Sequence, residues 1–180
     1  EYINNFKETY EIIGLLDDSY ENYEKIISSD YNYKYLGDIK THTIGKDFNY
    51  VLGIASVIFR RTIIDSFLQK GATFINIIHP MAYISPSAKL GVGNLVSPSA
   101  MIGPQVRVGN YNMLNGGIGL GHHTILGDNN FFGLNVSTLP GLVIGSSNVI
   151  SAGIILDKNV LDSCTIYYRY KEKVFALPKQ

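Results

Sequence analysis

Apolar residues recur at every sixth position through residues 84–156, and this period is the dominant pattern of the chain. Twelve of the thirteen positions are apolar, and Thr138 is the exception. The series is Ile84, Leu90, Val96, Ile102, Val108, Leu114, Leu120, Leu126, Phe132, Thr138, Ile144, Ile150 and Leu156. An unbroken six-residue repeat is typical of a parallel β-helix, in which each repeat supplies a short strand with one side chain turned inward.

A second period of 18 residues lies on the first. The tetrad Gly-x-x-Asn recurs at this spacing and ends at Asn94, Asn112, Asn130 and Asn148. Three repeats of six therefore make one coil, and about four coils at a strand spacing of about 4.8 Å give a prism roughly 20 Å tall. We expect the four asparagine amides to lie above one another in a hydrogen-bonded ladder.

The first eighty residues have a different pattern. Short apolar runs at 11–16, 50–55 and 74–78 predict strands, helical spacing of apolar residues predicts a helix over 60–70, and a shorter helix is predicted over 20–29. Strand, helix and strand in this order favour a βαβ unit with a parallel sheet. The sequence predicts a mixed fold: a small α/β domain over 1–79, a β-helix domain over 80–166 and a tail over 167–180.

Composition excludes several classes of partner. Fifteen basic residues balance fifteen acidic ones, so charge does not draw the chain to nucleic acid or anionic lipid. The single cysteine, Cys164, excludes an internal disulfide framework and fits a reducing compartment, hence a cytoplasmic location. No apolar run has the length of a membrane span, and no signal peptide is present. Because the chain begins at Glu1 without methionine, we expect a segment to precede it.

The pair His122-His123 interrupts a run of prolines. At one position of every third repeat the chain has Pro86, Pro104, His122 and Pro140, so one corner carries an imidazole in place of an inert ring. Imidazole is the commonest general base near neutral pH. Two alternatives remain open: exposed histidines without a role, and a zinc site, which needs three ligands that two adjacent residues do not readily provide.

Asp17 and Asp18 follow the first predicted strand. Ligands of parallel α/β sheets bind at the carboxyl ends of strands, where these carboxylates are suited to hydrogen bonds from a ribose or a base. Ordinary turn chemistry explains the same two residues, because aspartate is common in turns.

Taken together, these segments resemble the hexapeptide-repeat sugar acetyltransferases of the sialic-acid O-acetyltransferase and bacillosamine-pathway N-acetyltransferase type. The resemblance runs over EIIGLLDD at 11–18, Arg60 at the start of the helix, FINIIHPMAYISPSA at 74–88 and the repeats that follow. It implies a left-handed β-helix, a homotrimer with active sites between subunits, and acetyl-CoA as acyl donor. The implied acceptor is a nucleotide-linked amino sugar or sialic acid in surface-glycan synthesis.

The resemblance also implies roles for individual residues. His122 corresponds to the catalytic base, with His123 beside it; Asp17, Asp18 and Asn115 correspond to substrate-binding positions. Three residues on late coils correspond to the backbone that lines the pantetheine groove of the coenzyme: Gly141, Ala152 and Gly153. No metal is expected.

Four departures from the family pattern concern ligand sites. The family usually has Asp or Glu after the catalytic histidine, whereas His123 is not an anion, so we expect His122 to be a weaker base or to find a carboxylate elsewhere. The turn after the second strand reads Ala-Ser-Val at 55–57, and Arg-Tyr-Lys-Glu at 169–172 replaces a loop near coenzyme A. The first strand and its glycine-rich turn are missing.

The leading hypothesis is therefore acetyl-CoA-dependent N-acetylation of a nucleotide-linked amino sugar by direct transfer. The alternatives are O-acetylation of sialic acid or a related sugar, a non-catalytic β-helix scaffold, and a zinc hydratase-like β-helix.

Overall fold

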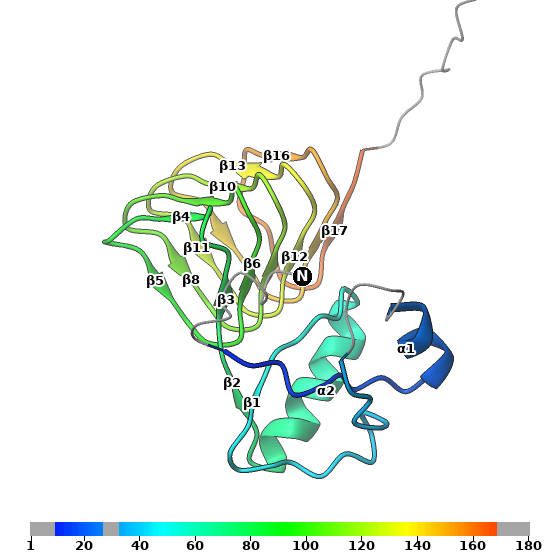
Figure 1. Cartoon of the computed structure of the whole chain (residues 1–180). Helices are drawn as coiled ribbons and strands as arrows, with labels where there is room; N and C mark the ends of the chain where they lie inside the picture. The colour runs from blue at the N-terminus through cyan, green and yellow to red at the C-terminus, as the bar shows by residue number, and fades with distance from the viewer. Residues whose placement is uncertain (1–9, 27–32, 169–180) are drawn as a thin grey trace, which may run out of the picture.

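The structure is a computed structural model that describes residues 10–26 and 33–168. A left-handed parallel β-helix forms the larger part, and a smaller α/β unit packs on one of its sides (Figure 1). The fold class predicted from the sequence is confirmed. The departure at 169–172 lies outside the described residues.

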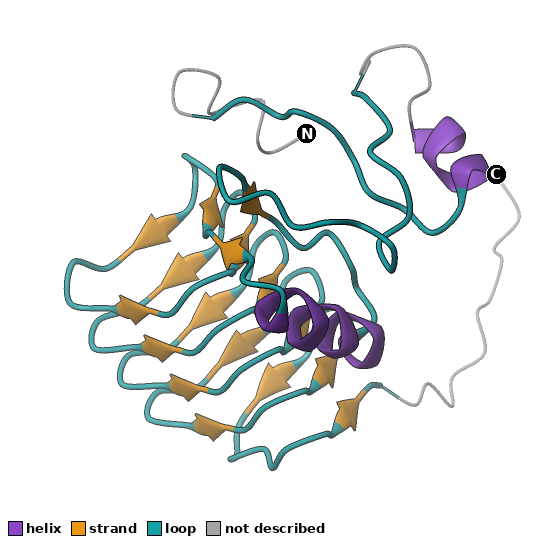
Figure 2. Ribbon diagram, turned by 90° about the horizontal axis from the view of Figure 1, so that it is seen from below, coloured by secondary structure: helices purple, strands orange, loops and turns teal. Residues whose placement is uncertain are grey.

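Three parallel sheets form the sides of the prism, seen from below in Figure 2. The β3 sheet contains β3 (Ile77–Ile78), β6 (Leu95–Val96), β9 (Met113–Leu114), β12 (Phe131–Phe132), β15 (Val149–Ile150) and β17 (Thr165–Ile166). The β4 sheet contains β4 (Tyr83–Ile84), β7 (Met101–Ile102), β10 (Gly119–Leu120), β13 (Ser137–Thr138) and β16 (Ile155–Leu156). The β5 sheet contains β5 (Lys89–Leu90), β8 (Arg107–Val108), β11 (Ile125–Leu126) and β14 (Val143–Ile144).

The six-residue series forms the inner stack, as predicted. Every member is the second residue of a two-residue strand, and partners in neighbouring coils are 18 residues apart, as in the pairing of Leu126 with Val108 and Ile144. Every third repeat along the chain lies in the same sheet. Each vertex of the prism therefore contains equivalent residues of successive coils. Burial of this stack is the main stabilising contribution of the β-helix.

The predicted asparagine ladder is present and begins one coil earlier, at Asn76. Asn112 Nδ2 donates to Asn94 Oδ1 at 3.1 Å, and Asn130 Nδ2 donates to Asn112 Oδ1 at 3.0 Å. Each of these oxygens also accepts the backbone N–H of the next asparagine. The ladder satisfies polar groups that the apolar core would otherwise leave unpaired.

The last coil is two residues shorter than the others. Ile144 pairs with Val160 and Val149 pairs with Thr165, an offset of 16 residues in place of 18. Asn148 lies at this end of the ladder, and its buried Nδ2 has no hydrogen-bond partner within the described chain.

The α/β unit contains α1 (Tyr20–Ile26), β1 (Asn49–Tyr50), α2 (Val57–Gln69) and β2 (Thr73–Phe74). β1 and β2 pair in parallel, and α2 connects them along the chain, which confirms the predicted βαβ unit. The helix begins at residue 57, before the predicted start, because Ser56 caps it by accepting the Phe59 N–H at 3.3 Å. No helix in the described ranges is long and apolar enough to cross a membrane.

The three strand predictions in this unit were wrong in extent. Residues 11–16 contain only an isolated bridge between Leu15 and Tyr35, and β1 ends at Tyr50. The strand predicted over 74–78 is two strands, since Asn76 already belongs to the solenoid: its Oδ1 accepts the Asn94 N–H at 2.8 Å. β3 pairs with β6, so the β-helix begins at residue 77.

A buried arginine joins the two parts. Arg60 on α2 is 1% exposed and donates from Nε to Asn129 Oδ1 at 2.8 Å. Its two terminal nitrogens donate to the carbonyls of Ile54 and Asn130, each at 2.9 Å. Burial lowers the pKa of Arg60 to about 10, so the side chain remains a cation at neutral pH. Neutral oxygens solvate this charge, because no ion pair of the described chain includes it.

We predict that Arg60→Ala destabilises the protein by about 3–5 kcal/mol, the usual cost of breaking a buried charged contact, because two buried acceptors and one partly buried acceptor lose their donor. Urea unfolding measures this loss. Arg61→Ala is the matched control: Arg61 is an exposed neighbour whose ion pair with Asp65 is worth less than about 1 kcal/mol. Equal losses in the two variants would show that the buried contacts do not hold the parts together.

Candidate active site

The His122 corner lies at the vertex where the β4 sheet meets the β5 sheet, between β10 and β11. The backbone holds it from both sides: His123 N–H donates to the Pro104 carbonyl, and Gly141 N–H donates to the His122 carbonyl, each at 2.9 Å. His123 has a left-handed backbone, with φ of 63°. Both histidine side chains are exposed, so this vertex presents two imidazoles to solvent.

The two imidazoles contact each other. Nδ1 of His122 lies 2.9 Å from Nδ1 of His123, and the ring planes are nearly perpendicular at 85°. No carboxylate forms an ion pair with either ring among the described residues. Nδ1 of His122 therefore contacts the neighbouring ring, which stands where the family pattern has a carboxylate.

Two buried threonines lie on the inner side of the same corner. Gly121 N–H donates to Thr138 Oγ1 at 3.0 Å, whereas the equivalent N–H one coil earlier, of Gly103, donates to the Leu120 carbonyl. Thr124 Oγ1 lies 3.2 Å from Thr138 Oγ1. A pair of hydroxyls thus fixes the backbone directly before His122.

Neither threonine belongs to the predicted site residues, although the sequence contains a signal for both. Thr138 is the one polar member of the inward series. Thr124 replaces an apolar residue at its own vertex position, where the other coils have Ala88, Val106 and Leu142. Two adjacent exceptions to the core pattern mark this corner.

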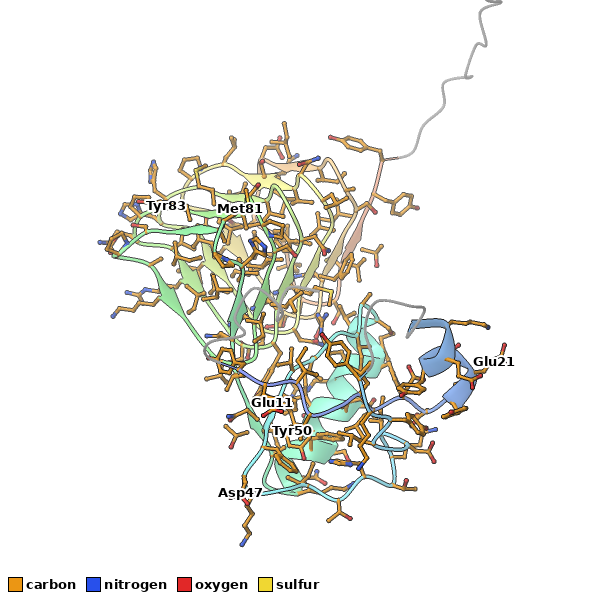
Figure 3. The ribbon with its side chains drawn as sticks, viewed as in Figure 1. Glu11, Glu21, Asp47, Tyr50, Met81 and Tyr83 are labelled. Atoms are coloured by element: carbon orange, nitrogen blue, oxygen red, sulfur yellow. The ribbon has the colours of Figure 1, made fainter. Side chains whose placement is uncertain are left out.

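The other predicted residues of the β-helix lie at the two edges of one side. Gly141 is directly above His123 at the vertex between the β4 and β5 sheets, and its N–H donates to the His122 carbonyl, while Asn115, Ala152 and Gly153 lie at the vertex between the β3 and β4 sheets. The outer face of the β4 sheet lies between them. Its outward residues are Tyr83, Met101, Gly119, Ser137 and Ile155, and Tyr83 is labelled in Figure 3.

The side chains on this outer face are smallest at the level of His122. Gly119 and Ser137 are small, whereas Met101 is 56% exposed and Ile155 is 64% exposed. A Cβ added to Gly141 or Gly153 would meet no atom within 4 Å, so the backbone there borders open space. The Asn115 side chain is held on its nitrogen side, because its Nδ2 donates to the Phe132 carbonyl at 2.7 Å.

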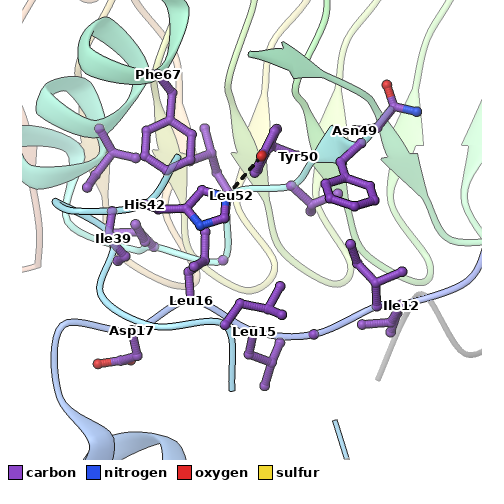
Figure 4. Close-up of a pocket in the computed structure, with 18 of the residues that line it drawn as sticks. Ile12, Leu15, Leu16, Asp17, Ile39, His42, Asn49, Tyr50, Leu52 and Phe67 are labelled. Carbon is purple, nitrogen blue, oxygen red and sulfur yellow. Dashed lines mark hydrogen bonds between the residues drawn. The ribbon is translucent and has the colours of Figure 1, made fainter. Parts of the chain in front are cut away.

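Asp17 and Asp18 lie far from this face, on the wall of a cavity of about 1210 Å³ in the α/β unit. Asp17 Oδ1 accepts the Ser19 N–H at 2.8 Å, which is the turn chemistry that competed with the binding role. Asp18 forms an ion pair with Lys40 at 3.5 Å. Figure 4 shows the Asp17 carboxylate turned away from the His42 ring.

The cavity contains a polar pair that the sequence did not indicate. His42 Nε2 lies 3.0 Å from Tyr50 Oη, which also accepts the Gly45 N–H at 3.1 Å (Figure 4). Burial, and next the positive charge of Lys70, lower the pKa of His42, so the ring is held neutral. Apolar side chains line most of the remaining wall, among them Leu52, Phe67 and Leu95.

The cavity and His122 lie on opposite sides of one chain. The α/β unit packs on the outer face of the β3 sheet, where Ile77 and Leu95 contribute to the cavity wall. The His122 vertex joins the other two sheets and is therefore opposite that face. The structure thus does not bring Asp17 and Asp18 together with His122. Within the described residues, no three His, Cys, Asp or Glu side chains gather as a metal site would require.

We predict that Thr138→Val destabilises the protein by about 1–3 kcal/mol, because the partly buried Gly121 N–H and the buried Thr124 hydroxyl lose a hydrogen-bond partner while side-chain volume is kept. Urea unfolding and hydrogen exchange at the Gly121 amide measure the effect. Thr138→Ser is the matched control, because it keeps the hydroxyl and preserves amide protection. If Thr138→Val instead stabilises the protein, the hydroxyl is not holding the corner.

Comparisons with known proteins support the fold. The structure is similar to the acetyltransferase domain of PglB from Neisseria gonorrhoeae in complex with acetyl coenzyme A, with a TM-score of 0.70 at 20% identity over 91% of this chain and 86% of that one. WeeI from Acinetobacter baumannii gives a TM-score of 0.64 at 15% identity over 91% and 87% of the two chains.

A third similar structure is PerB from Caulobacter crescentus in complex with CoA and GDP-perosamine, with a TM-score of 0.50 at 22% identity over 65% of each chain. No family model and no curated protein sequence matches the chain. At these identities the similarity establishes a shared architecture, in which this chain places its own histidine pair and cavity.

Proposed function

We propose that the protein is an acetyl-CoA-dependent acetyltransferase that acts on the amino group of a nucleotide-linked sugar. The observation that carries this proposal is the exposed His122 imidazole at a vertex where three other coils have proline. Support comes from the shared fold with an acetyltransferase domain in complex with acetyl coenzyme A and, at lower similarity, with a protein in complex with CoA and GDP-perosamine.

In the proposed reaction His122 is the general base. The acceptor nitrogen attacks the thioester carbonyl and loses a proton to His122 Nε2 as the carbon–nitrogen bond forms. The carbon–sulfur bond then breaks, and the proton on Nε2 passes to the leaving thiolate. Backbone N–H groups of the coils are suited to stabilise the tetrahedral oxyanion. No covalent intermediate with the enzyme is required.

The acyl donor fits the outer face of the β4 sheet. Gly119 and Ser137 have small side chains, so little projects from that face beside His122. The exposed backbone at Gly141 and Gly153 borders open space at its two edges. An extended pantetheine arm needs such a surface without projecting side chains. We assign Gly141, Ala152 and Gly153 to donor binding and Asn115, which lies at the same vertex as Ala152 and Gly153, to acceptor binding.

The cavity of the α/β unit is the proposed site for the nucleotide. Its volume of about 1210 Å³ is larger than the roughly 300–1,000 Å³ common for ligand pockets, so it leaves room for a nucleotide. Asp17 and Asp18 supply acceptors on its wall, and the His42–Tyr50 pair supplies a polar group inside it. A nucleoside offers hydroxyl and N–H donors for the carboxylates and an apolar base for the remaining wall.

We predict that His122→Ala lowers kcat by about 10²–10⁴, the range for loss of a general base. Acetylation of a nucleotide-linked amino sugar by acetyl-CoA measures this, and a hydroxyl acceptor tests O-acetylation. His122→Pro is a matched control for folding, because proline occupies this position in three other coils. It should unfold like the unaltered protein and still lose activity.

Near-normal turnover in both His122 variants would remove this residue from the mechanism. A thermal shift with acetyl-CoA tests the donor separately, because a ligand that binds only the folded state raises Tm. Absence of a shift at millimolar acetyl-CoA would favour a non-catalytic scaffold.

We further propose a homotrimer in which the cavity of one subunit faces His122 of another. One chain holds the two groups on opposite sides, so a neighbouring subunit is needed to bring them together. The exposed apolar side chains of the β4 sheet, Tyr83, Met101 and Ile155, supply surface for such a contact. Sedimentation equilibrium is expected to give the mass of three chains of 19.9 kDa each. A fully active monomer would contradict this arrangement.

A further inference from the structure

The contact between His122 and His123 restricts where protons sit. Two Nδ1 atoms at 2.9 Å are at hydrogen-bonding distance, and only one hydrogen fits between them. One ring must therefore donate and the other must accept. In a neutral imidazole only one nitrogen carries hydrogen, so the donor ring has a bare Nε2 and the acceptor ring has an Nε2–H. The pair thus presents one bare nitrogen and one N–H to the outside.

We propose that His123 is a positioning residue that accepts the Nδ1–H of His122 and so holds His122 in the tautomer whose Nε2 is bare. This inference rests on the proposed function, which requires a bare Nε2 on His122. The neutral ring of His123 then orients His122, the role that a carboxylate has in the family pattern. Unlike a carboxylate, it adds no negative charge to the site.

The arrangement also accommodates the proton that the base receives. When His122 Nε2 takes a proton from the acceptor, the ring becomes an imidazolium whose Nδ1–H still donates to His123 Nδ1. A hydrogen bond to the charged form stabilises it, so the contact strengthens as the reaction proceeds. The hydrogen bond between the rings is kept until Nε2 returns its proton to the leaving thiolate, and the pair is again neutral.

The backbone of the corner fixes the direction of the His123 ring. The left-handed conformation, with φ of 63°, recurs one coil below at Gln105 with φ of 60° and one coil above at Gly141 with φ of 74°. The coil geometry therefore sets this conformation, whatever the residue. Glycine and asparagine tolerate it best, which allows His123 to be replaced without new strain.

Nitrogen NMR of the whole protein tests the tautomers directly, because protonated and bare ring nitrogens differ in ¹⁵N chemical shift. The chain has four histidines, so single substitutions assign the signals. We expect a protonated Nδ1 and a bare Nε2 for His122, and the reverse for His123. In His123→Gly, His122 should become a mixture of tautomers. An Nε2–H tautomer of His122 in the unaltered protein would overturn the proposal.

Kinetics test the consequence. His123→Gly should lower kcat by about 10–100-fold with little change in KM, because a lost orienting partner typically costs this much. His123→Asn and His123→Asp supply an acceptor oxygen and should recover kcat relative to His123→Gly. Gln105→Gly is the matched control, since it makes the same backbone change one coil below and should leave kcat unaltered.

The outcomes separate this inference from the function on which it rests. If His122→Ala abolishes turnover while His123→Gly does not lower kcat, His123 has no positioning role but the general base stands. If kcat falls equally in His123→Gly, His123→Asn and His123→Asp, the ring acts in some other way and the proposal fails. If His122→Ala retains turnover, the proposed function fails, and the NMR result still decides the tautomers.

Discussion

The structure depends on a coil that closes after 18 residues. Closure places each strand against its equivalent in the next coil, so that backbone hydrogen bonds join neighbouring coils and inward side chains meet inward side chains. Phe132 between Leu114 and Ile150 shows the result for one sheet. The asparagine ladder extends the same constraint to polar groups, because amides repeated at this spacing lie within hydrogen-bonding distance of their own equivalents. Where the coil shortens by two residues, at residues 157–160, the ladder ends.

The same constraint makes the vertices available for chemistry. The side chain at position 122 of this vertex is exposed and contributes little to the core, so proline can become His122 without disturbing the stack. The inner side of that corner is altered as well, since Thr124 and Thr138 replace apolar residues and hold the Gly121 N–H. These two hydroxyls are tolerated in the core because each has a hydrogen-bond partner. An outer imidazole pair and an inner hydroxyl pair therefore form one local unit.

Arg60 determines which side of the prism the α/β unit covers. Its three hydrogen bonds reach the vertex between the β5 and β3 sheets, so the unit packs on the β3 sheet and leaves the β4 sheet exposed. One chain therefore carries two separate features: a cavity on the covered side and a histidine pair at the opposite vertex. The proposed reaction needs both, which is why the arrangement favours assembly with further copies.

The sequence by itself determined the inward stack, the 18-residue coil, the asparagine ladder and the vertex that carries His122. A local repeat converts position in the chain directly into position in space, so these features follow from counting. Only the tertiary structure decided the Arg60–Asn129 contact, the division of residues 74–78 between two sheets, the hydroxyl pair behind Gly121 and the Nδ1 contact of His122 with His123. The Arg60–Asn129 contact and the division of residues 74–78 both involve segments that share no sequence period. The last two depend on hydrogen-bond geometry and on a backbone angle of 63°, which no pattern of apolar and polar residues encodes.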